Sequence, residues 1–174
     1  MKWGIVMKNN NKGYTLIEII IVIAILAVVT SAATVSFRLI YNTRVTTSAR
    51  TVQSIAKTAR LNNMTKQKLK YIHLLKKDGL NYMYIDENLT TDMTKGDQQL
   101  GSTDMAIVYG PSDGTMIGLA NNKAITIYFD RSGRCFTYNM SGAPLPDIDT
   151  LEFTNGTRTS TINISRITGK VSME

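Results

Sequence analysis

Glu18 is the first residue whose chemistry demands an explanation. It is the one acid in an apolar run, residues 16–37, that contains no proline or glycine. An unpaired acid costs about 2.5–3.5 kcal/mol at the middle of a membrane helix and less near the interface, so a Glu18 packed among helices needs a cationic partner. A second interpretation needs no partner, because an acid in the first turn of a helix interacts favourably with the helix dipole. Neither interpretation assigns Glu18 to catalysis.

Residues that support catalysis are few. His73 is the one histidine and lies in a lysine-rich stretch, where we expect a solvated side chain. Cys135 is the one cysteine, so no disulfide forms within the chain, and we expect it to be buried in a strand. Asp147 and Asp149 are too few oxygen donors for a calcium loop. No P-loop, HExxH or GxSxG motif occurs, and we expect no enzyme, no cofactor and no metal site.

The formal net charge of +7 is unevenly distributed along the chain. Residues 38–77 hold ten lysines and arginines and no acid, whereas residues 78–123 hold seven acids against two lysines. This separation favours contacts between copies at least as readily as nucleic-acid binding. Phosphate contacts would fall to basic residues near the C-terminus, if several of these five lined one end of a sheet: Arg131, Arg134, Arg158, Arg166 and Lys170. Five acids in residues 124–174 balance them, so we rank DNA binding below solvated strand faces.

One long helix is expected to position Glu18. The apolar run would extend about 33 Å as a helix, enough to cross a hydrocarbon core of about 30 Å once. Beyond it, apolar residues recur every three or four positions. We predict a helix over residues 14–62, transmembrane over 14–37 and amphipathic over 38–62, with the basic leader on the cytoplasmic side. A secretory signal cut after Ala33 is the alternative.

The rest of the chain is expected to be a basic linker over residues 63–78 and a β-rich head over residues 79–174. Segments rich in β-branched and aromatic residues predict strands, as in Ala124-Ile-Thr-Ile-Tyr-Phe129. Two hairpins are predicted, with turns at residues 130–133 and at Asn155-Gly156, and a turn at Thr168-Gly169 precedes a last strand. A long helix followed by an antiparallel meander indicates an α+β fold.

Residues 12–18, Lys-Gly-Tyr-Thr-Leu-Ile-Glu, resemble the class III signal of type IV pilins and pseudopilins. The resemblance implies that residues 1–13 are a leader, that a prepilin peptidase cuts between Gly13 and Tyr14, and that the new N-terminus of Tyr14 is methylated. Phenylalanine is the family's usual first mature residue, so tyrosine is a departure. The resemblance also implies that Glu18 meets the amine of a neighbouring subunit and sets the register of assembly. It further implies the pilin fold, in which the first helix packs on an antiparallel sheet.

The resulting prediction is a minor pilin or pseudopilin of a type IV pilus, or of a related type II secretion or competence filament. Residues 128–134 and 161–173 resemble the C-terminal strands of GspH/FimT-like minor pilins. The implied partners are other pilin subunits, the prepilin peptidase and the assembly platform of the cytoplasmic (inner) membrane. The subunit would cross that membrane once, with its head outside, and then enter a cell-surface or periplasmic filament. The alternatives are a major pilin, a DNA-binding minor pilin for DNA uptake, and a membrane-anchored β domain unrelated to filaments.

Overall fold

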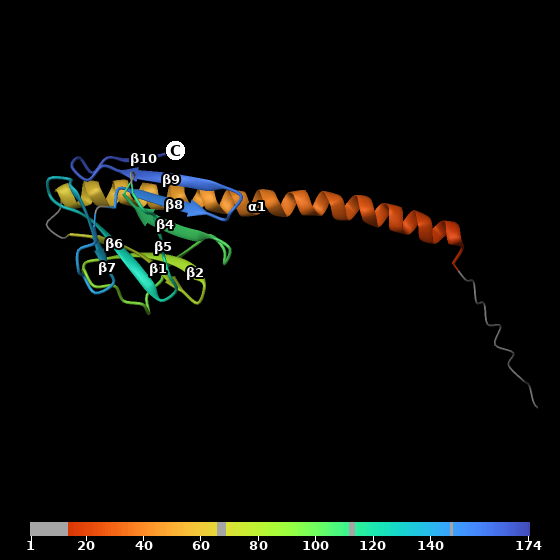
Figure 1. The fold of residues 1–174 in the computed structure, drawn as a ribbon, viewed down its shortest axis with the longest axis horizontal. Helices are drawn as coiled ribbons and strands as arrows, with labels where there is room; N and C mark the ends of the chain where they lie inside the picture. Colours follow the sequence, from red (N-terminus) through yellow and green to blue (C-terminus); the bar gives the residue numbers. More distant parts are fainter. Residues whose placement is uncertain (1–13, 66–68, 112–113, 147) are drawn as a thin grey trace, which may run out of the picture. The chain divides into compact units, whose positions relative to one another are not determined.

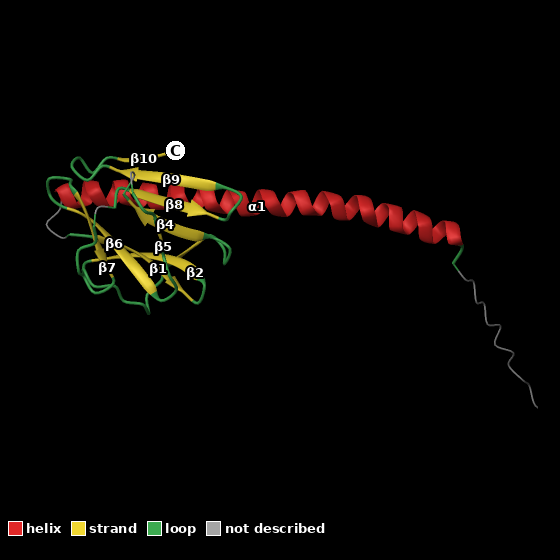
Figure 2. Ribbon diagram, viewed as in Figure 1, coloured by secondary structure: helices red, strands yellow, loops and turns green. Residues whose placement is uncertain are grey.

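The structure, a computed structural model, describes residues 14–65, 69–111, 114–146 and 148–174, and the side chains of residues 32–38 lie outside this description (Figure 1). The chain divides into two compact units, Met1–Arg38 and Leu39–Glu174. The helix α1 (Leu16–Thr65) begins in the first unit and continues into the second, which also contains every strand of the described residues (Figure 2).

In the second unit, α1 turns one apolar stripe toward the core. Val45, Ala49, Val52, Ala56 and Ala59 are all at most 3% exposed. Their spacing alternates between four and three residues, which keeps them on one side of a helix. Three of the five are alanines, whose small side chains let neighbouring strands approach the helix closely. The predicted packing of the amphipathic part of the helix on the strands is therefore confirmed.

The strands form two antiparallel sheets. Sheet A has the order β3-β2-β1-β6-β7 and consists of β1 (Tyr71–Lys77), β2 (Leu80–Asp86), β3 (Gln98–Leu100), β6 (Lys123–Phe129) and β7 (Cys135–Asn139). Sheet B has the order β10-β9-β8-β4-β5 and consists of β4 (Ala106–Gly110), β5 (Ile117–Gly118), β8 (Thr150–Thr154), β9 (Thr159–Ile164) and β10 (Val171–Met173).

The predicted hairpins are present, but the predicted single meander is wrong. β6 pairs with β7 and β8 pairs with β9, around the two turns expected from the sequence. β1 pairs with β6, and β4 with β8, so the chain passes repeatedly from one sheet to the other. The physical reason is that both sheets bury their apolar faces on the same helix stripe, and short alternating strands do not encode which partner they join.

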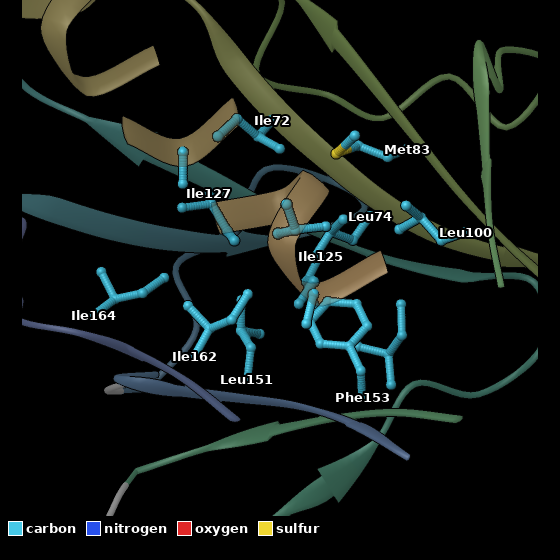
Figure 3. Packing of buried hydrophobic residues seen from close by; sticks show 14 of the residues in the cluster. Ile72, Leu74, Met83, Leu100, Ile125, Ile127, Leu151, Phe153, Ile162 and Ile164 are labelled. Atoms are coloured by element: carbon cyan, nitrogen blue, oxygen red, sulfur yellow. The ribbon is translucent and has the colours of Figure 1, made fainter. Parts of the chain in front are cut away.

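One core joins the helix and the two sheets. Figure 3 shows the side chains of Ile72, Leu74, Ile125 and Ile127 from sheet A gathered with those of Leu151, Phe153, Ile162 and Ile164 from sheet B. Each of these residues is at most 1% exposed. All the residues of this core lie between Val45 and Met173, so the second unit carries its own hydrophobic core.

The predicted linker over residues 63–78 is wrong. α1 continues to Thr65, and β1 occupies Tyr71–Lys77 at the centre of sheet A, between β2 and β6. The lysines around this segment suggested a solvated connection, yet the four residues Ile72 to Leu75 are all buried. Both faces of β1 are covered, so its apolar residues form a continuous run instead of alternating with polar ones.

His73 is buried, which corrects the prediction of a solvated side chain. Ile72 and Leu74 point into the main core, whereas His73 and Leu75 lie on the other face of sheet A, where Leu75 packs with Tyr84 and Ala124. The His73 ring stacks on the Tyr84 ring with 4.4 Å between centroids. His73 Nε2 donates to the carbonyl oxygen of Asn88 at 3.1 Å, and Nδ1 accepts from the hydroxyl of Thr126 at 2.9 Å. This ring therefore fastens the loop after β2 to the sheet.

The free energy of unfolding is expected to depend on pH through His73. Burial lowers the pKa of His73 below its usual value of 6.5 and outweighs the opposing influence of Asp86, while Lys95 lowers it further. The unfolded chain therefore binds a proton that the folded chain does not, so stability is fully present above about pH 7.5 and is lost as the pH falls below 6.5. Urea unfolding at several pH values should show this loss.

His73→Gln is the control for this prediction. The chain contains no other histidine, so the variant should show a flat profile between about pH 5.5 and 8 even if it is less stable throughout. A wild-type profile with no decrease in this range, or an equal decrease in the variant, would contradict the assignment.

Candidate functional site: the start of α1 and the basic end of the head

The start of α1 is fixed by Thr15 and Glu18. The backbone N–H of Thr15 donates to Glu18 Oε2 at 3.1 Å, and the backbone N–H of Glu18 donates to Thr15 Oγ1 at 3.3 Å. The Thr15 hydroxyl also donates to Glu18 Oε2 at 3.3 Å. This reciprocal pattern is a capping box, which satisfies backbone donors that the first turn of a helix leaves open. Within this chain Glu18 is therefore a capping residue.

The surface of α1 after Glu18 is apolar and exposed. Eleven large aliphatic side chains between Leu16 and Val29 are each at least 46% exposed: Leu16, Ile17, Ile19, Ile20, Ile21, Val22, Ile23, Ile25, Leu26, Val28 and Val29. Contiguous apolar surface of this size marks a site of interaction with another protein or with a membrane. Tyr14, directly before the helix, is 83% exposed. Gly13, on the other side of the expected cleavage point, lies outside the described residues.

Within the described ranges, no helix has both the length and the apolar character needed to cross a membrane. The transmembrane span expected over residues 14–37 is thus not found in the described part of the chain.

Four of the five basic residues expected near phosphates gather at one end of the head, at the β6–β7 and β9–β10 turns (Figure 1). Arg131 and Arg134 belong to the first turn, and Arg166 and Lys170 to the second. The two turns touch, because the backbone N–H of Cys135 donates to the carbonyl oxygen of Arg166 at 2.9 Å. We call these four residues, together with Arg60 of α1, the basic end.

Arg60 joins the basic end through a contact that sequence reasoning missed. Its Nη2 donates to the carbonyl oxygen of Thr168 at 2.8 Å, so the last part of α1 holds the β9–β10 turn. Gly133 and Gly169 make room for this arrangement. A Cβ atom on Gly169 would lie 1.8 Å from the carbonyl oxygen of Gly133 and 2.8 Å from Arg60 Nε. The sequence signal was the pair of glycines at turn positions, but it does not show that the two turns meet.

Arg158 does not belong to the basic end. It follows β8, where its Nε donates to Thr46 Oγ1 at 3.0 Å. Thr46 and Arg60 are separated by about 21 Å along α1, from the helical rise per residue. Arg158 therefore lies apart from the other four basic residues.

Two carboxylates partly neutralise the positive charge of the basic end. Asp130 accepts from Arg134 Nε at 2.9 Å and from Ser132 Oγ at 2.7 Å. Burial alone would raise the pKa of Asp130, but these hydrogen bonds and the Arg134 charge outweigh it and lower the pKa to about 2. Asp149 lies in the same groove as Arg166 and Lys170. The basic end thus combines five cations with two carboxylates.

The described residues give little support for a metal site or for a reactive thiol or imidazole. Within them, no group of three or more His, Cys, Asp and Glu side chains is arranged to hold a metal ion. Cys135 is 2% exposed, and burial raises the pKa of its thiol to about 12, so the thiol stays protonated. His73 is engaged in the packing of the loop after β2.

Comparison with protein families gives a match at the start of the chain. Residues 8–34 match the prokaryotic N-terminal methylation motif. The chain therefore carries a class III prepilin signal, the N-terminal motif of type IV pilins and pseudopilins, and the resemblance of residues 12–18 is confirmed. The helix packed on antiparallel sheets agrees with a pilin-like α+β arrangement. The match ends before the head, so the GspH/FimT-like assignment stays a prediction.

The comparison with curated proteins and the comparison with solved structures found no match.

Proposed function

We propose that this chain is a subunit of a type IV pilus or of a related secretion or competence filament. The observation that carries the proposal is the match of residues 8–34 to the N-terminal methylation motif. In this proposal prepilin peptidase cuts between Gly13 and Tyr14, the amine of Tyr14 is methylated, and the chain is anchored in the cytoplasmic membrane until it assembles. The exposed apolar residues of α1 then pack against the same residues of neighbouring subunits.

Glu18 has two roles in this proposal. Both hydrogen bonds that reach its carboxylate use Oε2, and within the described residues Oε1 accepts none. The capping box can therefore persist while Oε1 receives the cationic amine of Tyr14 from a neighbouring subunit. Such a pair neutralises an acid that would otherwise be packed among apolar side chains without a partner. It also fixes the axial register of one helix against the next, as a single polar group does in a coiled coil.

Two substitutions separate the pairing role of Glu18 from its capping role. Glu18→Gln keeps a side chain that completes a capping box but removes the charge. Thr15→Ala removes the cap and keeps the charge. We expect Glu18→Gln to lower incorporation into filaments at least about tenfold, which corresponds to about 1.4 kcal/mol, and Thr15→Ala to assemble nearly normally. Quantitative immunoblots of sheared filaments and of membranes provide the measurement.

The opposite ranking would refute the pairing role. If Thr15→Ala fails to assemble while Glu18→Gln assembles normally, Glu18 acts only as a helix cap.

We further propose that the subunit is a minor one. The support is the resemblance of residues 128–134 and 161–173 to the C-terminal strands of GspH/FimT-like minor pilins. These segments form the β6–β7 turn and the β9–β10 hairpin, which meet at the basic end. A subunit present at a few copies per filament would support a minor role, whereas one that makes up most of the filament mass would be a major pilin.

DNA capture is the second candidate function. Its support is the gathering of Arg131, Arg134, Arg166 and Lys170 at one end of the head, where they could contact phosphates without reading sequence. Against it stand the carboxylates of Asp130 and Asp149 at the same end, which reduce the local positive field. We therefore rank DNA capture below a structural role.

A further inference from the structure

The basic end carries an exposed apolar side chain beside two of its cations. Ile167, in the β9–β10 turn, is 82% exposed and lies in the groove that Arg166 and Lys170 line. Met64 of α1, which is 42% exposed, lies beside Gly133 at the same end. Apolar side chains next to polar and charged residues are typical of protein interfaces.

The turn that carries Ile167 is held in place before any partner binds. Arg60 Nη2 donates to the carbonyl oxygen of Thr168 at 2.8 Å. Within the turn, the backbone N–H of Gly169 donates to the carbonyl oxygen of Ser165 at 2.6 Å, and that of Ser165 donates to the carbonyl oxygen of Lys170 at 2.9 Å. A side chain on a rigid turn loses little conformational entropy on binding, so it contributes more to affinity than a mobile one.

The partner of this surface must be acidic and partly apolar. Five cations against two carboxylates attract an acidic surface, and the exposed Ile167 side chain gains nothing from contact with a phosphate backbone. These observations favour a protein over a nucleic acid.

The chain itself contains an acidic segment. Residues 78–104 hold six acids and one basic residue, Lys95. Asp86 pairs with Lys95 at 2.6 Å and Glu87 with Lys70 at 2.8 Å. Asp92, Asp97 and Asp104 are exposed and form no ion pair with another described residue. The segment that carries Asp92 is anchored to sheet A, because the Asp92 backbone N–H donates to the Tyr84 hydroxyl at 2.6 Å.

Asp97 and Asp104 lie at the opposite edge of sheet A from the basic end. They flank β3, the edge strand that pairs with β2. The β6–β7 turn joins the two strands at the other edge, and β2 and β1 lie between β3 and β6. β3 and β6 are three strand spacings apart, about 14 Å, so Asp97 and Asp104 lie away from the basic end of the same copy.

We propose that the basic end of one copy docks, through Ile167 and Lys170, on the acidic segment 92–104 of a second copy. The two surfaces are different, so the contact is head-to-tail. This inference rests on the proposed filament function, in which two copies of this chain are neighbours. It adds the surfaces of the heads to the contacts that α1 provides.

Zero-length cross-linking tests the proposal on the full-length chain. Unlabelled and 15N-labelled chains, mixed in filaments or in detergent, would be treated with a carbodiimide, which joins a lysine amine to a carboxylate in direct contact. We expect cross-linked peptides that join Lys170 of one isotope to Asp92, Asp97 or Asp104 of the other. Lys170→Arg should abolish these peptides, and Lys123→Arg should leave their yield unchanged. Ile167→Ser should reduce the yield about fivefold to tenfold, as loss of an interface anchor does.

Three results would overturn the inference. The first is cross-linking of Lys170 only within one isotope. The second is the absence of mixed-isotope Lys170 peptides from filaments whose subunits begin at Tyr14, an outcome that leaves the filament function intact. The third is binding of duplex DNA by the full-length chain that is lost in Arg166→Ala and falls steeply with salt, without mixed-isotope peptides. That last result would assign the basic end to DNA.

Discussion

Gly169→Ala is expected to destabilise the head by about 3 kcal/mol or more, since a Cβ atom at this position forces two backbone segments apart. Gly169 has a φ of +61°, and its Cβ would lie 1.8 Å from the carbonyl oxygen of Gly133. The backbone of the β6–β7 turn cannot yield without breaking the hydrogen bond from Cys135 to Arg166. Thermal or urea unfolding of the full-length chain in detergent would measure the loss.

Gly156→Ala is the matched control. Gly156 has a φ of +79°, also in the left-handed region, but no atom lies within 4 Å of the position its Cβ would take. Alanine there carries only the backbone cost of that region, about 1–2 kcal/mol. Equal losses for the two variants would mean that backbone conformation, rather than the contact between the two turns, determines the effect at Gly169.

Asn63→Ala is expected to cost about 2–4 kcal/mol, because it removes three hydrogen bonds from a fully buried side chain. Asn63 Nδ2 donates to the carbonyl oxygens of Lys70 at 2.9 Å and of Phe129 at 2.8 Å, and Oδ1 accepts from the backbone N–H of Lys70 at 2.8 Å. This side chain joins the last turns of α1 to β6 and to the entrance of β1. The loss would be measured by urea unfolding.

Two variants test the assignment of these bonds. Asn63→Asp retains an acceptor for Lys70 but cannot donate to the two carbonyl oxygens, so it should be nearly as damaging as Asn63→Ala. Asn62→Ala, one position earlier and only half-buried, should change stability by no more than about 0.5 kcal/mol. Comparable losses at Asn62 and Asn63 would contradict the proposed role of the Asn63 side chain.

Local signals in the sequence predicted the elements that depend on short-range chemistry. The turn at Asn155-Gly156 requires a left-handed residue, and Gly156 supplies it with a φ of +79°. The hairpin at residues 130–133 ends on Gly133, whose φ is +85°. The amphipathic part of the helix followed from the spacing of Val45, Val52, Ala56 and Ala59. In each case residues close together in the sequence determine the conformation, so the sequence alone predicts these elements.

The features that the sequence did not reveal depend on distant segments. β1 looked like a linker because lysines surround it, but the loop after β2 and Met140 cover the face that His73 occupies. The division into two sheets depends on the pairing of β1 with β6 and β4 with β8, across long stretches of chain. The contact of Arg60 with Thr168 joins positions 108 residues apart. Periodicity does not report such contacts.

The candidate sites show the same difference between features that neighbouring residues determine and features that distant segments form. The signal around Gly13 and Glu18 is contiguous, and the family match supports it. The capping box was also readable, because Thr15 and Glu18 have the spacing of that motif, although the sequence analysis considered only the helix dipole. The basic end is assembled from α1 and two turns, so the residues that form it could not be identified from their order in the sequence. Arg60 was missed, and Arg158 lies elsewhere on the head.

The mature N-terminus is the measurement that tests the central claim most directly. The full-length chain would be produced together with a prepilin peptidase, and its N-terminal peptide would be identified by mass spectrometry. The account predicts a chain that begins at Tyr14 and carries a methyl group on its amine, whereas Gly13→Arg should remain uncut. A wild-type chain that stays uncut beside an active peptidase, or that begins after Ala33, would contradict the account.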